Sequence, residues 1–161
     1  MTFQALDAEN LKNLQTQFDI IVHFELIEHL LDPNAFMQSI RDNLSENGFC
    51  IFTTPNAASL ELKALDYNKT RLLAHSLYPP MHLNAFSTQN IALFAFKNKF
   101  KLKAIDTPGK FDISILSHSA DELEDKILRQ ICAFDEKTKA YLQYLLVYLD
   151  ASSHMRVVLQ K

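Results

Sequence analysis

Two carboxylates and an imidazole follow directly after one apolar run of the chain. The run is Phe18 to Phe24, and the next five residues, Glu25-Leu26-Ile27-Glu28-His29, contain the polar group. A carboxylate beside an imidazole can orient a general base and raise its pKa, because the anion stabilises the protonated ring. Two carboxylates and one histidine would also suit a divalent ion. The structural alternative places Glu28 near a helix start and packs His29 beneath a sheet edge.

Two further histidines also have both a functional and a structural interpretation. His82 lies in the segment PPMHLNAFS. There it could contact a substrate and deprotonate a hydroxyl, or be a loop histidine bonded to backbone. The residues alone slightly favour the loop alternative, and we keep His82 among the candidate catalytic residues. His154 begins the last apolar run and is expected to be structural.

The elements around the first cluster predict where it lies. Phe18 to Phe24 is apolar without alternation, which indicates a strand covered on both faces. Asp32-Pro33 predicts a capped helix start, and Asn47-Gly48 predicts the helix end with glycine in the left-handed conformation. Phe49 to Thr53 predicts the next strand, which completes a right-handed βαβ crossover. Glu25 to His29 then follow the carboxyl end of the first strand, where open α/β sheets bind ligands.

The rest of the chain predicts more strands and helices in one domain, residues 1–161. The other strands expected are Phe3–Leu6, Phe100–Asp106, Asp112–Leu116 and His154–Gln160. The other helices expected are one within 57–77, one capped by Ser87, and a hairpin of 121–134 and 136–150. Residues 108–152 would therefore form a mainly helical insertion before the last strand.

Composition excludes several classes of protein. The chain has 161 residues, of which 48% are apolar and 22% charged, as in an ordinary globular domain. A net charge of −3 argues against a nucleic-acid partner, and no apolar run approaches the roughly 18 residues of a membrane helix. Cys50 and Cys132 lie in apolar runs, and we expect buried thiols in a cytoplasmic protein. The only glycines are Gly48 and Gly109, so the glycine-rich turn of nucleotide-binding α/β domains is absent.

Several segments, in order, resemble class I S-adenosylmethionine-dependent methyltransferases, in the branch of quinone and glycan-cluster O-methyltransferases. FDIIVHFELIEHLLDP resembles the fourth strand and the motif after it, and LSENGFCIFTTPN resembles the fifth strand, with Asn47 replacing a glycine. PPMHLNAFS resembles the segment before the fifth helix, and TPGKFDISIL and SSHMRVVLQK resemble features of the glycan-cluster members.

The resemblance implies an α/β fold and a reaction. The fold would be the C-terminal part of a Rossmann-like sheet, with strands 4-5-7-6, the last strand antiparallel, and helices on both faces. The reaction would be methyl transfer from S-adenosylmethionine to an oxygen of a small or glycan-linked acceptor, with nitrogen as the less favoured alternative.

The resemblance also implies the role of each candidate residue. LDAENL is similar to the loop after the third strand, where Asp7 would contact the adenine amino group and Ala8 the ring. The residues after the fourth strand would line the methionine part of the cofactor and then the acceptor. Some quinone O-methyltransferases with an E-x-x-E-H pattern use a divalent ion, but we assign no metal ligands. The cofactor-binding residues are then Asp7, Ala8, Phe24 and Glu25, and the catalytic residues are Glu28, His29 and His82.

The chain departs from the family pattern at its start. Under the resemblance it would begin at the third strand, and the glycine-rich loop and the acidic residue that holds the ribose would be missing. We therefore expect an incomplete domain that binds S-adenosylmethionine weakly or not at all and is inactive alone. The alternative is a non-catalytic fragment that packs, dimerises or binds a partner. Residues 18–24 would form an open apolar edge, which predicts a homodimer unless Phe3–Leu6 covers it.

Overall fold

The computed structural model describes residues 5–8, 11, 14, 16–65, 77 and 80–161. Its strands, β1 (Phe18–Phe24), β2 (Leu44–Pro55), β3 (Lys101–Asp106) and β4 (His154–Gln160), form one mixed sheet. The order is β1-β2-β4-β3, with β2 parallel to β1 and β4 antiparallel to both of its neighbours. This is the predicted 4-5-7-6 order with an antiparallel last strand, so the predicted fold class is confirmed.

Helix α1 (Pro33–Asn43) connects the two parallel strands and begins as predicted. The Asp32 carboxylate accepts hydrogen bonds of 3.0 Å from the backbone N–H groups of Asn34 and Ala35. Pro33 occupies the first helical position, where the missing N–H costs nothing. The helix therefore has a complete N-terminal cap that does not use Glu25 or Glu28.

The end of α1 differs from the prediction. The helix stops at Asn43, and the extended backbone of β2 begins at the next residue. The left-handed conformation belongs to Asn47, with a φ of 64°, and not to Gly48. Asparagine tolerates this conformation because its short polar side chain bonds locally. Gly48 is required for another reason, since an added Cβ would lie 2.9 Å from the carbonyl oxygen of Ser45.

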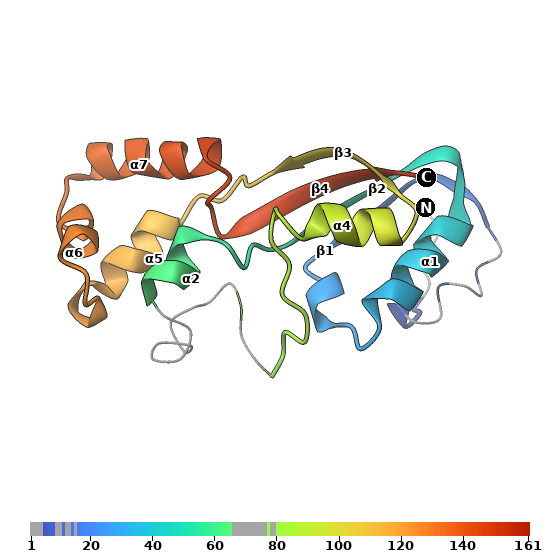
Figure 1. The fold of residues 1–161 in the computed structure, drawn as a ribbon, viewed down its shortest axis with the longest axis horizontal. Coiled ribbons are helices and arrows are strands. Elements are labelled where there is room, and N and C mark those ends of the chain that lie inside the picture. The colour runs from blue at the N-terminus through green and yellow to red at the C-terminus, as the bar shows by residue number, and fades with distance from the viewer. Residues whose placement is uncertain (1–4, 9–10, 12–13, 15, 66–76, 78–79) are drawn as a thin grey trace.

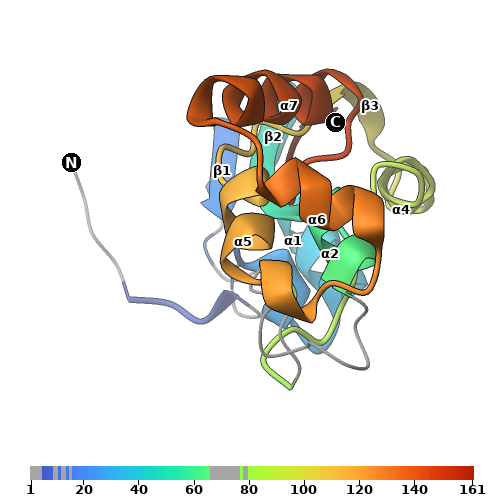
Figure 2. The same cartoon turned by 90° about the vertical axis from the view of Figure 1, so that its left-hand side faces the viewer.

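The remaining helices divide between the two ends of the sheet. They are α2 (Leu60–Leu65), α4 (Ile91–Lys97), α5 (Asp112–His118), α6 (Lys126–Cys132), α7 (Glu136–Tyr148) and the 3₁₀ turns η2 (Ile27–His29) and η3 (Ala120–Glu122). Figure 1 shows α2, α5, α6 and α7 grouped at one end, away from α1. Figure 2 looks at that end, where α5 contacts α2, α6 and α7. The expected strand 3–6 and helix 57–77 lie partly outside the described residues.

The predicted strand at Asp112–Leu116 is wrong, because these residues begin α5. The sequence DISIL alternates polar and apolar residues, which mimics the period of a strand. In the helix, Ile113 and Leu116 are three residues apart and share one buried face. Packing against neighbouring helices therefore overrides the short alternating pattern.

Two groups of buried side chains hold the fold together. The larger lies between the sheet and helices α1 and α4, and includes Phe36, Ile40, Phe52, Ile91 and Val157. The smaller joins α5 to α6 through Leu116, Leu123 and Cys132. Cys50 and Cys132 are both buried free thiols, as predicted. No helix in the described ranges is long and apolar enough to span a membrane.

A buried carboxylate ties the helical end to the sheet. Asp112 is fully buried and accepts hydrogen bonds from Gln143 Nε2 at 2.6 Å, Ser152 Oγ at 2.5 Å and the N–H of Ser153 at 2.5 Å. Gly109 passes close to this group, and a Cβ there would overlap the Ser152 hydroxyl. The contacts join α5 and α7 to the residues that lead into β4.

One face of β1 remains open to solvent. Ile20, Val22 and Phe24 are 58%, 53% and 63% exposed, whereas His23 on the opposite face is buried. In the described part of the chain, β1 is also an edge strand of the sheet. The expectation that this strand would be covered on both faces is therefore wrong within the described residues.

Candidate functional site

The candidate site lies where β1 and β2 end and β4 begins. The two parallel strands bring Glu25, directly after β1, beside Thr53 near the end of β2, and the Glu25 N–H donates to the Thr53 carbonyl at 3.1 Å. β4 runs antiparallel to β2, so its first residue, His154, lies at the same edge. Glu25 adopts a φ of 47°, in the left-handed region. Such strain in a non-glycine residue persists only where the surrounding contacts hold it.

Glu28 is the buried acid of the site, with 1% of its side chain exposed. Thr54 Oγ1 donates a 2.8 Å hydrogen bond to Glu28 Oε2, while Oε1 has no hydrogen-bond partner among the described residues. Burial raises the pKa of Glu28, and its hydrogen bonds offset only part of the rise. The carboxylate is thus fixed through one oxygen and leaves the other available.

The loop that carries His82 is pinned to η2. The N–H groups of Leu83 and Asn84 donate to the Glu28 carbonyl at 2.7 Å and 3.0 Å. The Asn84 amide donates to the carbonyl of Leu30 at 2.7 Å. These contacts place the His82 ring edge-on to the His29 ring, with centroids 4.6 Å apart. The structure therefore brings together all three predicted catalytic residues.

His29 is held in one tautomer. Its Nδ1 lies 2.8 Å from the carbonyl oxygen of Met81, and a carbonyl can only accept, so Nδ1 carries the proton. The other nitrogen, Nε2, then offers a lone pair and lies 3.7 Å from Glu28 Oε1. For His82, burial lowers the pKa. The cluster thus presents an imidazole lone pair beside an unpartnered carboxylate oxygen.

His154, for which the sequence predicted a structural role, lies at the same edge and pairs with Glu25. Its Nε2 lies 3.2 Å from Glu25 Oε2, and Thr53 Oγ1 donates to Glu25 Oε1 at 2.7 Å. Burial alone would raise the pKa of Glu25, but the bonds from His154 and Thr53 outweigh it and the pKa is lowered. The bond to Glu25 raises the pKa of His154 against the opposing effect of burial. The predicted order 4-5-7-6 pairs the fifth strand (β2) with the seventh (β4). That pairing is the only feature of the sequence analysis that could have suggested this contact.

The other residues predicted to bind cofactor lie elsewhere. Ala8 lines a cavity of about 310 Å³ together with His23, Leu26 and other apolar side chains. Asp7 is exposed, and Phe24 points its exposed ring to the open face of β1. Among the described residues that line the cavity, only His23 is polar, so these side chains offer few hydrogen-bonding groups to the polar parts of a cofactor.

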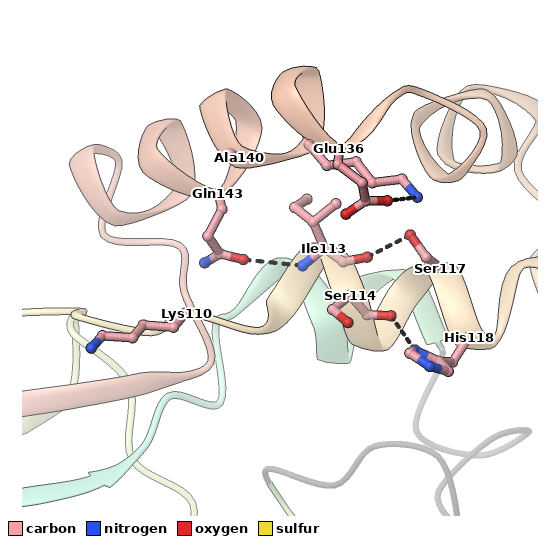
Figure 3. Close-up of a pocket in the computed structure, with 9 residues that line it drawn as sticks. Lys110, Ile113, Ser114, Ser117, His118, Glu136, Ala140 and Gln143 are labelled. Atoms are coloured by element: carbon pink, nitrogen blue, oxygen red, sulfur yellow. Dashed lines mark hydrogen bonds and ion pairs between the residues drawn. The ribbon is translucent and has the colours of Figure 1, made fainter.

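A larger cavity of about 410 Å³ lies between α5 and α7, at the helical end of the molecule (Figure 3). Its polar side chains bond mainly to the protein itself. Gln143 accepts from the Ile113 N–H, Ser117 donates to the Ile113 carbonyl, and His118 bonds the Ser114 carbonyl at 2.7 Å. These bonds stabilise the packing of the helices, and we place the candidate site at η2 instead.

Comparison with known proteins identifies the family. Residues 1–105 match the family model described as a methyltransferase domain. No curated protein matches the sequence. Among solved structures, the cyclase SpnF aligns with a TM-score of 0.57 and 13% identity, over 99% of this chain and 55% of that one.

Two methyltransferases align similarly. A SAM-dependent methyltransferase from Archaeoglobus fulgidus gives a TM-score of 0.53 and 14% identity, over 97% of this chain and 66% of that one. A SAM-dependent methyltransferase from Thermotoga maritima gives a TM-score of 0.56 and 16% identity, over 94% of this chain and 61% of that one. The chain thus spans about half to two thirds of these structures, and identities this low show the fold alone. The family model matches well over half of the residues, and the chain therefore belongs to the methyltransferase domain family.

Proposed function

We propose that this chain is the acceptor-side part of an S-adenosylmethionine-dependent methyltransferase that acts on an oxygen of a small or glycan-linked molecule. The observation that carries the proposal is the meeting of Glu28, His29 and His82 past the carboxyl end of β1. Family membership supports methyl transfer. A general base in this cluster favours an oxygen acceptor over a nitrogen acceptor. A hydroxyl must lose its proton as it attacks, whereas a neutral amine can attack before losing one.

The residues of the site have distinct tasks in this proposal. S-Adenosylmethionine supplies a methyl group already activated on a sulfonium, so the acceptor needs only correct placement and loss of one proton. His29 Nε2 accepts that proton, because the bond from Nδ1 to Met81 leaves Nε2 as the free base. Glu28 Oε1, 3.7 Å away, stabilises the imidazolium that forms. His82 packs against His29 and limits the orientation of both the ring and the acceptor.

We propose further that this chain alone binds the cofactor weakly and does not turn over. Its two glycines, Gly48 and Gly109, form no glycine-rich turn, and His23 is the only polar side chain among the described residues that line the cavity at Ala8. Calorimetry with S-adenosylmethionine should detect no binding in the micromolar range. A micromolar or tighter dissociation constant would show that these residues hold the whole cofactor.

The acceptor-site proposal is tested in an active form of the domain. The chain is fused to the glycine-loop segment of a related methyltransferase, and transfer of labelled methyl groups to catechols and glycans is measured. Glu28→Gln and His29→Ala should each lower turnover by about 10²-fold, the usual scale for a general base, without changing cofactor affinity. His118→Ala, in an exposed position on α5, is the matched control. Normal turnover with a lowered melting temperature in both site variants would make the cluster structural.

A second candidate function is a non-catalytic module that packs against another copy of the chain. The open face of β1, with Ile20, Val22 and Phe24 more than half exposed, favours it. Small-molecule acceptors would then show no binding at the η2 cluster, and charge substitutions on β1 would abolish assembly. The two functions are therefore separated by variants at different sites.

A further inference from the structure

A third cavity, of about 370 Å³, lies between the first turn of α1, the segment 84–86 and helix α4. Its size is in the range of sites that hold a small organic molecule. We propose that this cavity binds an aromatic carboxylate that also carries a hydroxyl or amino group. The described residues that line it include none of the three predicted catalytic residues. The site is therefore separate from the η2 cluster and does not rest on the proposed function.

The walls of the cavity are mainly apolar and aromatic. The apolar side chains that line it are Pro33, Ala85, Phe86, Leu93 and Phe94. The rings of Phe86 and Phe94 lie with their centroids 5.1 Å apart, and Phe86 is buried. Apolar walls around a few polar groups are typical of ligand sites, and aromatic side chains pair well with a ligand ring. The walls therefore favour a ligand with a flat aromatic face.

The polar groups of the cavity are mostly hydrogen-bond donors. Asn34 Oδ1 accepts a 3.0 Å bond from Asn98, so the Asn34 NH₂ group remains for a ligand. Asn90 Oδ1 accepts a 2.9 Å bond from the N–H of Ser87, and its NH₂ group is bonded only at 3.4 Å to a backbone carbonyl. Lys97 is exposed and makes no ion pair with any described residue. Two amide donors and one ammonium group suit a carboxylate.

The third asparagine, Asn84, has the opposite polarity. Its NH₂ group donates to the Leu30 carbonyl at 2.7 Å, which leaves Oδ1 as an acceptor. A hydroxyl or amino group of the ligand can donate to this oxygen. Asn84 also belongs to the loop that carries His82, and its backbone N–H donates to the Glu28 carbonyl at 3.0 Å. A ligand bonded to Asn84 would therefore restrain the loop of the candidate site.

The test is a fluorescence titration of the purified chain with 6-hydroxy-2-naphthoate, without cofactor or methyl acceptor. The chain contains no tryptophan, so the naphthalene ring can be excited with little background from the protein. We expect one molecule bound per chain with a submillimolar dissociation constant. 2-Naphthol, which lacks the carboxylate, should bind at least about tenfold more weakly, the scale of one charge-assisted hydrogen bond.

A lysine variant tests the charge of the site. Lys97→Gln should weaken binding of 6-hydroxy-2-naphthoate at least about fivefold. Its affinity for 2-naphthol should not change, because only the carboxylate uses the ammonium group. The matched control is Lys101→Gln, at an exposed lysine on β3, which should keep the affinity of the unmodified chain. Circular dichroism checks the fold of both variants.

Side-chain amide signals in NMR spectra report which residues the probe contacts. The signals of Asn34, Asn84 and Asn90 should shift when the probe saturates the chain. The signal of Gln143, which lines the cavity between α5 and α7, should stay in place. This pattern separates binding between α1 and α4 from binding at the helical end of the molecule.

Three results would overturn the proposal. One is the absence of stoichiometric binding by the folded chain at millimolar probe. Another is equal affinity of the unmodified chain for 6-hydroxy-2-naphthoate and 2-naphthol. The third is binding that survives Lys97→Gln but is lost in Val22→Glu, which would place the probe on the open face of β1. Because no methyl transfer is measured, binding can succeed or fail independently of the proposed function.

Discussion

Glu25 and His154 come from opposite ends of the chain and pair at 3.2 Å across the edge where β1 ends and β4 begins. Glu25 accepts a second bond from Thr53, and its backbone is held in the left-handed region at a φ of 47°. The pair thus joins three neighbouring strands at the site edge. Charged partners at such a position make the stability of the edge depend on pH.

The first prediction concerns the pH range in which this pair stabilises the fold. The raised pKa of His154 means that its contribution is complete below about 6.5 and is lost as pH rises through the folded-state value. The lowered pKa of Glu25 means that its contribution is complete above about 4.5 and is lost as pH falls. Both side chains are over 40% exposed, so the effect should stay below about 1 kcal/mol.

The measurement compares the unfolding free energy of the unmodified chain with that of His154→Gln across pH. The difference should be largest between about pH 4.5 and 6.5 and should shrink at higher pH. His118→Gln, on α5, should show no such profile. If the difference in unfolding free energy is constant from pH 5 to 9, Glu25 does not raise the pKa of His154.

A second prediction concerns His23, which is buried and whose ring nitrogens have no hydrogen-bond partner in the part of the chain that the structure describes. Its ring stacks on Phe52 at 4.7 Å and meets Phe36 edge-on. Burial lowers the pKa of His23 from 6.5 to about 4. As pH falls from 6.5 to 4, His23 binds a proton in the unfolded chain but stays neutral in the folded chain, so the free energy of unfolding falls. At about 1.4 kcal/mol per unit, the loss reaches about 3 kcal/mol.

His23→Phe should remove this acid sensitivity while keeping the stacking on Phe52. Urea unfolding at pH 7 and pH 4.5 should show a much smaller loss of stability in the variant than in the unmodified chain. Substitution of an exposed histidine, His118→Phe, provides the control. Equal acid sensitivity in the His23 variant and the unmodified chain would place the titrating group elsewhere.

The sheet could be predicted from sequence because its signals are local. The apolar runs at 18–24 and 154–160 and the cap at Asp32 depend on neighbouring residues only, and they occur where expected. The segment 112–116 was predicted wrongly because five alternating residues cannot distinguish a strand from a helix whose face is set by distant packing. Local pattern therefore predicts elements well only where tertiary contacts agree with it.

The candidate site was only partly predictable for the same reason. Glu28 and His29 are adjacent in sequence and follow the end of a predicted strand, so their grouping could be inferred. The contact of His82 with His29 depends on the backbone hydrogen bond from Asn84 to Glu28 in η2 and on the side-chain bond from Asn84 to Leu30. His154 reaches Glu25 only through the register of β2 and β4. Neither contact has a sequence signal near the residues concerned.

The third prediction tests the anchor of the His82 loop. Asn84→Ala removes the 2.7 Å bond to the Leu30 carbonyl, which should cost about 1 kcal/mol of stability. Hydrogen exchange at the N–H groups of Leu83 and Asn84 should become faster, because these groups donate to Glu28. Gln38→Ala, which removes a surface side-chain bond on α1, is the control. Unchanged exchange at both amides would show that the loop is held by its backbone alone.

The fourth prediction concerns Asp112, which bonds three donors in a fully buried position. Asp112→Asn turns one accepting oxygen into an NH₂ group that faces donors, so the expected loss is about 3 kcal/mol. Thermal and urea unfolding measure it, with Asp121→Asn, an exposed position in η3, as the control. A loss below about 1 kcal/mol would mean that the network rearranges around the amide.

The last prediction concerns assembly through β1. The two edges of the sheet differ: β3 carries the exposed lysines Lys101 and Lys103, which oppose strand pairing, whereas β1 carries Ile20 and Val22. We propose that a second copy pairs with β1, because an antiparallel pair centred on Ile21 would place Ile20 of each copy against Val22 of the other.

Light scattering over a range of concentrations should show a dimer that dissociates on dilution, and Val22→Glu should make the chain monomeric. Charge reversal at the other edge, Lys103→Glu, should leave the dimer unchanged, because β3 takes no part in the pairing. A chain that is monomeric at every concentration would contradict the proposal. So would a dimer that persists in Val22→Glu, because two glutamates placed in an apolar strand interface without cations lose their hydration and repel each other.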